Sequence, residues 1–306
     1  MTRSRPPFVS AQDHPLGVRR DWIWRGYQIR YTYIRSRRRR SHSLPILLLH
    51  GFGSALGQWR ANLHPLSEDH TVYALDFLGF GASEKASTHY RVGLWADLVY
   101  DFWHNFIGRE AIVVGHSLGS LVALTAVATY PEMARGLALL TLPDPQPRQP
   151  PAWARALERF FSSPILLWPL FQLVRQPGFL RKVLRSLYTR DELVDRELVE
   201  LFAAPARDRG ALEVFYRLSL SRNDPDYSPD VAELLSPLTL PILLIWGESD
   251  RVIPFAGASR IVPLNPRIKL VSVPDTGHVL YDERPEAVND AILGWIDGEM
   301  RSARSQ

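Results

Sequence analysis

The sequence predicts an α/β protein with a doubly wound, mostly parallel sheet and a helical cap inserted after the sixth strand. Short apolar runs without polar alternation recur along the chain, as expected of strands that are covered on both faces. Helical patterns lie between these runs. This alternation of strands and helices stops between Leu142 and Ile242, where the sequence has a helical pattern interrupted by prolines. Such an insertion fits a cap at the carboxyl edge of the sheet, where α/β proteins bind ligands.

The individual elements follow from the apolar pattern. Strands are expected at 22–24, 27–34, 46–49, 72–75, 111–114, 137–142, 242–246 and 268–273. The first two alternate around Arg25-Gly26, which predicts an antiparallel hairpin. Helices are expected at 58–67, 90–107, 118–130, 255–262 and 284–296. These elements divide the chain into a basic flexible leader at 1–21, a core at 22–142 and 239–306, and a cap at 143–238.

Composition excludes several kinds of site. The 306 residues are 46% apolar, which is normal for a globular chain with a sizeable core. Cysteine is absent, so disulfides, thiolate chemistry and cysteine-bound metals are excluded. We expect neither a metal nor a cofactor.

Arginine far outnumbers aspartate within residues 1–40. This excess predicts either a solvated tail with a hairpin tip at 37–40, or attraction to an anionic membrane surface or another polyanion. No nucleic-acid-binding pattern follows, so no such partner is expected. Residues 1–20 lack the apolar core of a secretory signal, and no apolar run reaches the roughly 18–20 residues that span a bilayer. We therefore expect a soluble or peripheral protein of the cytoplasm.

The segment from Ile112 to Gly119 reads IVVGHSLG, an apolar strand that runs into G-x-S-x-G and then into a helical pattern. A serine hydroxyl is a weak nucleophile unless the backbone presents it to a base, and a tight turn from strand to helix does this. Gly115 and Gly119 are expected because a side chain at either position would collide with the neighbouring strand or helix. Ser117 is therefore the candidate nucleophile.

A nucleophilic serine needs a base, and the base needs an acid that orients it. Asp250 and His278 each lie just past the carboxyl end of a predicted strand, in the chain order serine, acid, histidine. They should emerge at the same edge of the sheet as Ser117. Taken singly, they would be a turn aspartate and a histidine at a helix start, but together they favour catalysis. Asp144 is a rival acid, and Asp275 is better explained as a loop-forming residue.

The negative charge that develops on a substrate oxygen needs two preorganised N–H donors. Leu118, the residue after the nucleophile, offers one, and Phe52, in a glycine-rich turn after an earlier strand, offers the other. His50 and His116 flank these turns. For both histidines we favour a structural role, because His278 already supplies the base.

Four features together are typical of one known family: the strand-to-helix turn at Ser117, called the elbow below, HGFG at 50–53, DFLGFGAS at 76–83, and the Asp250/His278 pair. With them, the chain resembles the α/β-hydrolase superfamily from about Trp22 to Trp295, outside the cap. Within it, WIWRGYQIRY at 22–31 and VYALDFLGFG at 72–81 resemble the cyanobacterial and plastid branch that contains chlorophyll dephytylase and pheophytinase. That branch implies hydrolysis of the phytyl ester of a chlorophyll-type pigment near thylakoid membranes.

The chain departs from its relatives at two positions. Ser120 stands where many have a second glycine, and Glu84 replaces a common aspartate. Ser120 is small enough to leave the elbow intact. The substrate is a separate question, because it is set by the cap and not by the fold.

The cap segment at 160–174 reads FFSSPILLWPLFQLV, and basic residues on both sides outnumber the acidic ones. It is too apolar for a solvated lid and, with two prolines, too short to span a bilayer. It either packs the cap onto the sheet or docks at a membrane interface. Both alternatives favour an apolar acyl or alkyl substrate, with Phe161, Leu167, Trp168 and Phe171 as candidate binding residues.

Three functions remain open. The first is a serine carboxylic-ester hydrolase that forms an acyl-enzyme on an apolar small-molecule ester, with the phytyl ester of chlorophyll or pheophytin as the leading case. The second is a cofactor-free perhydrolase or carbon–carbon bond hydrolase with the same triad. The third is a non-catalytic, membrane-associated binding protein, against which an intact triad argues. Epoxide hydrolases and haloalkane dehalogenases would need an aspartate in place of Ser117.

Overall fold

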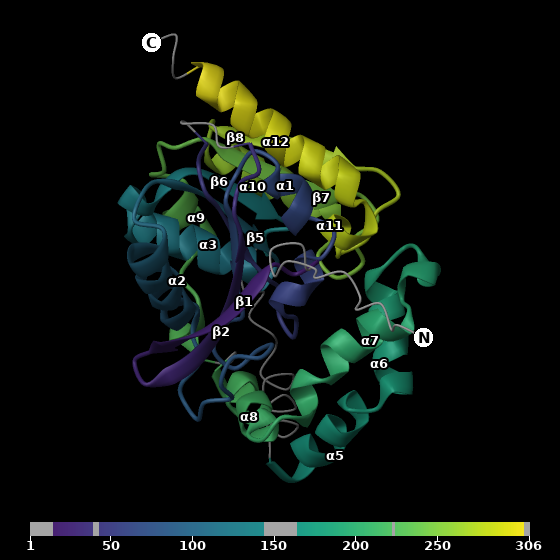
Figure 1. Ribbon diagram of the computed structural model, residues 1–306. Helices are drawn as coiled ribbons and strands as arrows, with labels where there is room; N and C mark the ends of the chain where they lie inside the picture. Colours follow the sequence, from purple (N-terminus) through teal and green to yellow (C-terminus); the bar gives the residue numbers. More distant parts are fainter. Residues whose placement is uncertain (1–14, 39–42, 144–163, 222–223, 303–306) are drawn as a thin grey trace, which may run out of the picture.

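The computed structural model describes residues 15–38, 43–143, 164–221 and 224–302. Within these residues, one eight-stranded sheet has the order β1-β2-β4-β3-β5-β6-β7-β8 (Figure 1). The strands are β1 Val18–Trp24, β2 Tyr27–Ile34, β3 Ile46–Leu49, β4 Val72–Leu75, β5 Ala111–His116, β6 Ala134–Leu140, β7 Ile242–Gly247 and β8 Ile268–Val273. β1 pairs antiparallel with β2, and β2 with β4, whereas the remaining pairs are parallel. The predicted fold class is confirmed.

The unalternating apolar runs arise because both faces of the sheet are covered. In β3, Leu47 and Leu49 belong to one buried cluster, whereas Ile46 and Leu48 belong to another on the opposite face. Alternate side chains of a strand point to opposite faces, so a strand buried on both sides has apolar residues at every position.

Helices cover the two faces as separate layers. One face is packed by α2 (Val92–Phe106), α3 (Leu118–Thr129), α9 (Val231–Leu235) and α10 (Ala258–Ile261). The other is packed by α1 (Leu63–Ser67), α11 (Leu280–Glu283) and α12 (Pro285–Ser302). Short 3₁₀ turns complete the core: η1 Leu56–Trp59, η2 Pro131–Met133, η6 Phe255–Gly257 and η7 Val262–Leu264.

Two predicted elements differ from the structure at their boundaries. The helix expected at 58–67 is divided into η1 and α1, because Pro65 cannot lie inside a continuous helix. β1 begins at Val18, four residues before the strand expected at 22–24. β1 is an edge strand with exposed Arg19 and Arg20, so it lacks the apolar pattern on which the boundary was based.

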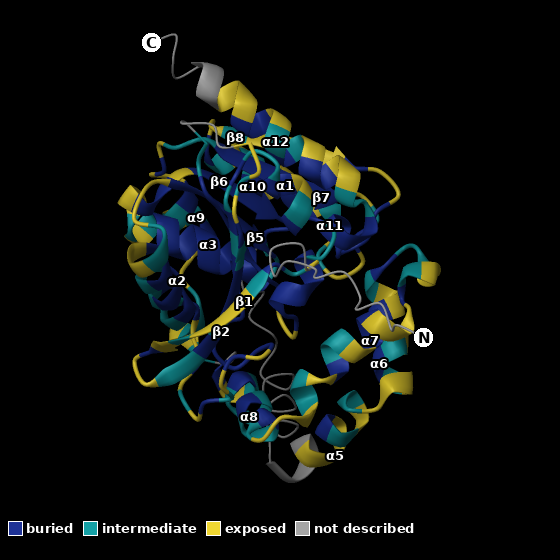
Figure 2. Cartoon of the chain, in the orientation of Figure 1, coloured by how far each residue is buried: buried dark blue, intermediate teal, exposed yellow. Residues whose placement is uncertain are grey.

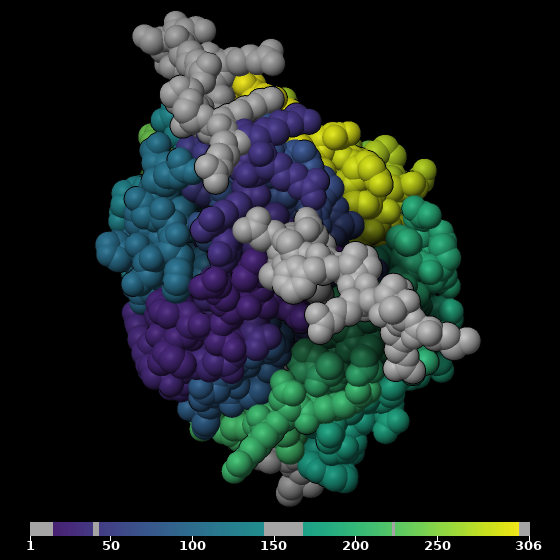
Figure 3. Space-filling view, viewed as in Figure 1, coloured from purple at the N-terminus to yellow at the C-terminus, as the bar shows by residue number. Residues whose placement is uncertain are grey.

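The cap follows β6 and forms one end of the molecule, a continuous green and teal surface against the core (Figure 3). Its elements are α5 Pro164–Val174, α6 Pro177–Leu187, η3 Asp191–Leu193, α7 Arg196–Ala203, η4 Pro205–Arg207, α8 Ala211–Ser221 and η5 Pro225–Tyr227. Leu184 of α6 and Leu198 of α7 join one core cluster, whereas Leu218 of α8 joins the other. Figure 2 shows that α6 and α7 remain exposed on their outer sides. No helix among the described residues is long and apolar enough to cross a bilayer.

Candidate active site

Ser117 lies in a strained turn between β5 and α3, with φ 52° and ψ −116°. Such a conformation costs a non-glycine residue about 1–3 kcal/mol, so the surrounding structure must impose it. The Ser117 N–H donates to Leu140 O of β6 at 2.9 Å. A Cβ on Gly115 would lie 2.1 Å from Gly119 O, and one on Gly119 would lie 2.3 Å from Leu49 O. The two glycines therefore let β3, β5 and α3 approach closely around the serine.

Ser120 strengthens this turn. Its hydroxyl oxygen lies 2.6 Å from Gly115 O and 2.9 Å from Leu140 O, so its one proton is shared between these two acceptors. Serine thus replaces the second glycine of many relatives without leaving a buried hydroxyl unpaired, and it ties the elbow to β6.

Asp250 and His278, which follow β7 and β8, form a buried pair. His278 Nδ1 lies 2.8 Å from Asp250 Oδ2. Asp250 Oδ1 accepts from Val252 N at 2.8 Å and from Ile253 N at 2.9 Å. Because both carboxylate oxygens are engaged, the pair holds the proton of the imidazole on Nδ1. His278 Nε2 is then left as the acceptor.

The elbow and the histidine lie side by side. The ring of His116, the residue before Ser117, has its centroid 4.8 Å from that of His278. His116 Nε2 donates to the His278 carbonyl at 2.8 Å. Among the described residues, the Ser117 hydroxyl forms no hydrogen bond with His278. In unliganded enzymes this contact is often long and tightens when substrate binds.

The two N–H groups predicted to stabilise an oxyanion are those of Phe52 and Leu118. Among the described residues, neither Phe52 N nor Leu118 N donates a hydrogen bond. Leu118 is the first residue of α3, where the N–H groups lack partners within the helix and favour negative charge.

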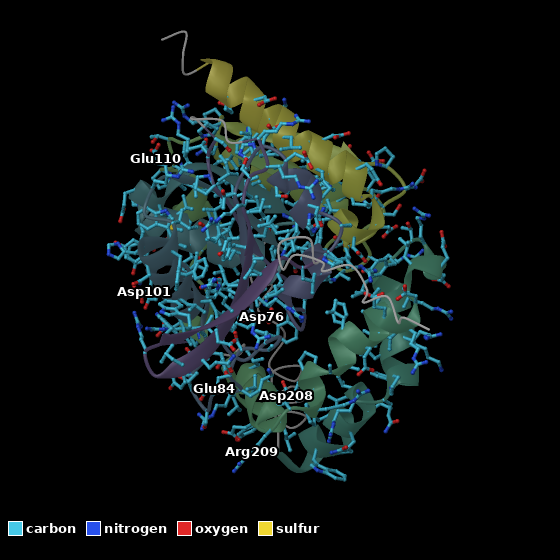
Figure 4. All side chains as sticks on the ribbon, in the orientation of Figure 1. Asp76, Glu84, Asp101, Glu110, Asp208 and Arg209 are labelled. Carbon is cyan, nitrogen blue, oxygen red and sulfur yellow. The ribbon has the colours of Figure 1, made fainter. Side chains whose placement is uncertain are left out.

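Asp76, at the end of β4, organises the turn that carries Phe52. Its Oδ1 accepts from Leu56 N at 2.6 Å and its Oδ2 from Ala82 N at 2.7 Å. Burial raises the pKa of Asp76 to about 6. Asp76 is buried, and Figure 4 shows it near the middle of the view. The sequence analysis used Asp76 only as part of a motif. The available signal was a carboxylate directly after an apolar strand and before two glycines.

His50 and His116 are engaged by the backbone. His50 Nε2 accepts from Phe77 N at 3.1 Å, so its Nδ1 carries the proton and donates to Gly51 O at 2.7 Å. Burial lowers the pKa of His50 to about 4 and holds the pKa of His116 well below its usual range. Both rings are therefore neutral at pH 7, as a structural role requires.

We expect the neutral His50 ring to make the fold sensitive to acid. A histidine that titrates at 6.5 when unfolded and at about 4 when folded stabilises the protein fully above pH 6.5. This contribution, about 3 kcal/mol, is lost as the pH falls from 6.5 through 4. Urea unfolding at pH 7 and pH 4.5 should show a smaller difference for His50→Gln than for the native protein.

The native protein must be compared with the His50→Gln variant because the titration of Asp76 changes the stability with pH in the opposite direction. Its raised pKa adds stability below pH 3.8 that is lost as the pH rises to about 6. Nuclear magnetic resonance supplies the direct measurement. A His50 ring signal that titrated near pH 6.5 would contradict the expectation.

The cap is hydrogen-bonded to the loop that carries His278. The His278 N–H donates to Leu187 O, the last residue of α6, at 2.8 Å. Buried Glu283 accepts from Thr189 N of the cap at 3.0 Å and from Gly277 N of the loop at 3.2 Å. The backbone of the histidine is therefore positioned partly by the cap.

A second contact reinforces this junction. Tyr188 donates its hydroxyl proton to Asp282 Oδ2 at 2.8 Å, and Asp282 Oδ1 lies 3.2 Å from Arg60 Nε. These residues were not predicted from the sequence. Their partners are far away along the chain, and no local pattern relates them.

The other predicted residues do not gather into one site. Asp275 is exposed with φ 47°, as expected of a turn residue. Trp168 is 55% exposed, whereas Phe171, on the same helix, is buried and lies 5.6 Å from the Phe215 ring. Their role in substrate binding stays a prediction. Asp144, Phe161 and the side chain of Leu167 lie outside the described residues. In the described ranges, no group of three or more ligating side chains could hold a metal ion.

Residues 46–291 match the model of the alpha/beta hydrolase family. The chain belongs to this family. It is 28% identical over 254 residues to the uncharacterized hydrolase YugF of Bacillus subtilis, covering 82% of this chain and 89% of that protein. This α/β-hydrolase is also 27% identical over 315 residues to the chloroplastic pheophytinase of Arabidopsis thaliana. That match covers 82% of this chain but 60% of the pheophytinase.

Among solved structures, this α/β-hydrolase is similar to a bacterial membrane phospholipase A. The two share 27% identity and a TM-score of 0.73, covering 92% of this chain and 86% of the other. Other relatives at similar identity are named epoxide hydrolases and a 2-(acetamidomethylene)succinate hydrolase. Membership of the family therefore shows a hydrolase and leaves the bond that it cleaves open.

Proposed function

We propose that this α/β-hydrolase is a serine hydrolase that cleaves carboxylic esters with an apolar acyl or alkyl group. The observation that carries the proposal is the 2.8 Å contact between His278 Nδ1 and Asp250 Oδ2, beside the strained turn at Ser117. A serine at this position supports attack on a carbonyl. Epoxide opening by a carboxylate nucleophile would require aspartate there.

In the acylation step, the serine, the histidine and the two N–H donors each have one role. Ser117 Oγ attacks the ester carbonyl carbon while His278 Nε2 takes the serine proton. The carbonyl electron pair moves onto oxygen, where the N–H groups of Phe52 and Leu118 stabilise the negative charge. The carbon–oxygen bond to the alcohol then breaks, and the alcohol leaves with the proton from His278.

Deacylation repeats the sequence with water. His278 removes a proton from water as it attacks the acyl carbon, and then returns a proton to Ser117 as the acid leaves. Asp250 stabilises the imidazolium in both steps, because its carboxylate is held in place by the N–H groups of Val252 and Ile253. A perhydrolase or carbon–carbon bond hydrolase would use the same three residues, so only the substrate distinguishes these reactions.

Support for an apolar substrate comes from the cap and from the relatives. Trp168, Leu170 and Leu173 of α5 are 55%, 44% and 43% exposed, so the cap presents apolar surface. One relative is named a pheophytinase and one similar structure is of a membrane phospholipase A. Pheophytin and phospholipids both carry long hydrocarbon chains. The phytyl ester of chlorophyll or pheophytin is our leading specific case.

Two measurements test this function. A fluorophosphonate probe should form one covalent adduct, which peptide mapping assigns to Ser117. Chlorophyll a, pheophytin a and p-nitrophenyl esters of increasing chain length then define the substrate. Release of phytol would support the pigment case, and turnover of only the simple esters would exclude it. If the probe does not react and no ester is hydrolysed, the serine hydrolase proposal fails.

We further propose that the cap docks on anionic membranes. Residues 164–190 contain Arg175, Arg181, Lys182, Arg185 and Arg190 but no acidic residue. Arg185 and Arg190 form ion pairs with Asp191 and Glu192, at 3.8 and 2.9 Å, so the cations offered to a membrane are Arg175, Arg181 and Lys182. Apolar side chains beside cations are typical of surfaces that insert at a lipid interface. Such docking would bring the cap to substrates dissolved in the bilayer.

The double variant Trp168→Ala/Leu173→Ala should bind phosphatidylglycerol vesicles at least about tenfold more weakly than the native protein in co-sedimentation. Burying each such side chain is worth about 1.5–3 kcal/mol, and 1.4 kcal/mol corresponds to tenfold in affinity. The matched control is Leu220→Ala/Leu270→Ala, which removes exposed apolar side chains of α8 and β8. Equal loss of binding in both double variants would contradict docking through α5.

A further inference from the structure

A cleft of about 590 Å³ opens at the edge of the sheet opposite Ser117. Its lining includes three arginines and three tyrosines, namely Arg20, Arg35, Arg109, Tyr31, Tyr33 and Tyr73. The lining comes from the start of β1 and β4, the end of β2, and the residue positions just before β3 and β5. Ser117, Asp250 and His278 instead follow the carboxyl ends of their strands. The cleft is therefore separate from the candidate active site.

Among the described residues, every charged side chain that lines the cleft is an arginine, and no aspartate or glutamate of these ranges lines it. Glu110, next to Arg109 in the chain, lines a different cleft. Within the part of the chain that the structure describes, none of the three arginines forms an ion pair. Two other arginines near Arg20 and Arg35 in the sequence do, since Arg30 lies 2.6 Å from Asp21 and Arg37 lies 3.2 Å from Glu68.

The arginine side chains line the same cleft as the three tyrosine rings. The Arg20 guanidinium lies 5.7 Å from the centroid of the Tyr33 ring, which stacks on Tyr73 at 5.9 Å. Burial raises the pKa of Tyr73, and the positive charges of Arg109 and Arg35 oppose that rise. Three cations that line one concave site repel, and an anion bound in the site would relieve this repulsion.

One uncharged hydrogen-bond donor in the lining of the cleft also has no partner among the described residues. Ser36 lines the cleft, and its hydroxyl oxygen is buried with no hydrogen-bond partner among the described residues. Buried hydroxyls are normally paired, so the unpaired Ser36 hydroxyl is a donor in the wall of the cleft that a bound acceptor could satisfy. Guanidinium forks and hydroxyl donors match the several acceptor oxygens of a phosphate group.

We propose that this cleft binds a phosphomonoester dianion, a function separate from ester cleavage at Ser117. The dianion supplies more charge than a carboxylate or a phosphodiester, as three unpaired arginines require. Its source is either a soluble phosphate ester or a lipid headgroup. Arg109, which lines the cleft, is adjacent in the chain to Glu110, and Figure 4 shows Glu110 at the opposite end of the molecule from the cap residues Asp208 and Arg209. A flat membrane that contacts the cap would therefore not reach the cleft.

Titration calorimetry with glycerol 3-phosphate, at constant ionic strength, tests the site. Arg35→Ala/Arg109→Ala should weaken binding at least about tenfold, because each charge-assisted hydrogen bond contributes strongly. The matched control Arg19→Ala/Arg135→Ala removes two exposed arginines that do not line the cleft and should bind like the native protein. Ser36→Ala should weaken binding several-fold without changing charge. Equal weakening in both arginine variants, or no saturable binding to the native protein, would overturn the site.

Vesicles distinguish the two sources. The Trp168→Ala/Leu173→Ala protein, which lacks the proposed cap contact, is mixed with vesicles of phosphatidic acid or phosphatidylglycerol. Binding only to phosphatidic acid, lost on adding Arg35→Ala/Arg109→Ala, assigns the site to a lipid headgroup. Binding of glycerol 3-phosphate without vesicle binding assigns it to a soluble ester. Labelling of Ser117 by a fluorophosphonate should be unchanged in the Arg35→Ala/Arg109→Ala and Ser36→Ala proteins, so this site and the ester hydrolase proposal fail independently.

Discussion

Ser117→Ala is expected to lower kcat for hydrolysis of a p-nitrophenyl ester by about 10⁶-fold. The variant keeps the donors at Phe52 and Leu118 but has no oxygen that can form the acyl-enzyme. What remains is binding and stabilisation of charge by the oxyanion donors, which gives a residual acceleration of about 10³- to 10⁴-fold over water. Alanine also tolerates the positive φ poorly, so the fold should be checked by urea unfolding alongside the kinetics.

The control is Ser259→Ala, which removes an exposed hydroxyl from α10 and should leave kcat and probe labelling unchanged. The Ser117 interpretation would be abandoned if the alanine variant kept more than a hundredth of the native kcat. It would also be abandoned if a fluorophosphonate labelled the variant as fast as the native protein. Either result would mean that another group is the nucleophile.

Asp250→Asn is expected to lower kcat by about 10⁴-fold. Val252 N and Ile253 N require an oxygen at one position of the side chain, so the amide group of asparagine would be turned toward His278. His278 Nδ1 would then accept a hydrogen bond instead of donating one. The proton moves to Nε2, and the nitrogen that should take the serine proton can no longer do so.

The pH profile separates this effect from a loss of structure. The rate of the asparagine variant should rise more steeply with pH than that of the native protein, because hydroxide can replace the disabled base. Asp275→Asn is the matched control, since it removes a nearby carboxylate from an exposed turn with positive φ that asparagine tolerates. Equal losses in the two variants would show that only local charge matters.

The parts of the site that were predictable from the sequence are those that depend on short-range geometry. An apolar strand followed directly by a glycine-flanked serine predicts one backbone conformation, and Ser117 has it. Asp250 and His278 were predictable because parallel strands bring their carboxyl ends to a common edge. Each of these inferences needs only the residues next to a strand.

The contacts that hold the site together were not predictable in this way. Asp76 supports the Phe52 turn through N–H groups on two separate loops. Glu283 joins the cap to the His278 loop across more than ninety positions of sequence. The start of β1 was missed for a different reason. An exposed edge strand is held by backbone hydrogen bonds, so its side chains carry little apolar pattern.

The bond from the His278 N–H to Leu187 O has a consequence for engineering. Caps of such enzymes are attractive units to exchange, because the core can supply the chemistry while the cap supplies selectivity. Here an exchange made at the ends of the cap would also replace Leu187 and Thr189, which anchor the histidine loop. A chimera that keeps 187–189 from this chain and varies only the helices outside them should preserve turnover. One that replaces the whole insertion would alter rate and selectivity together.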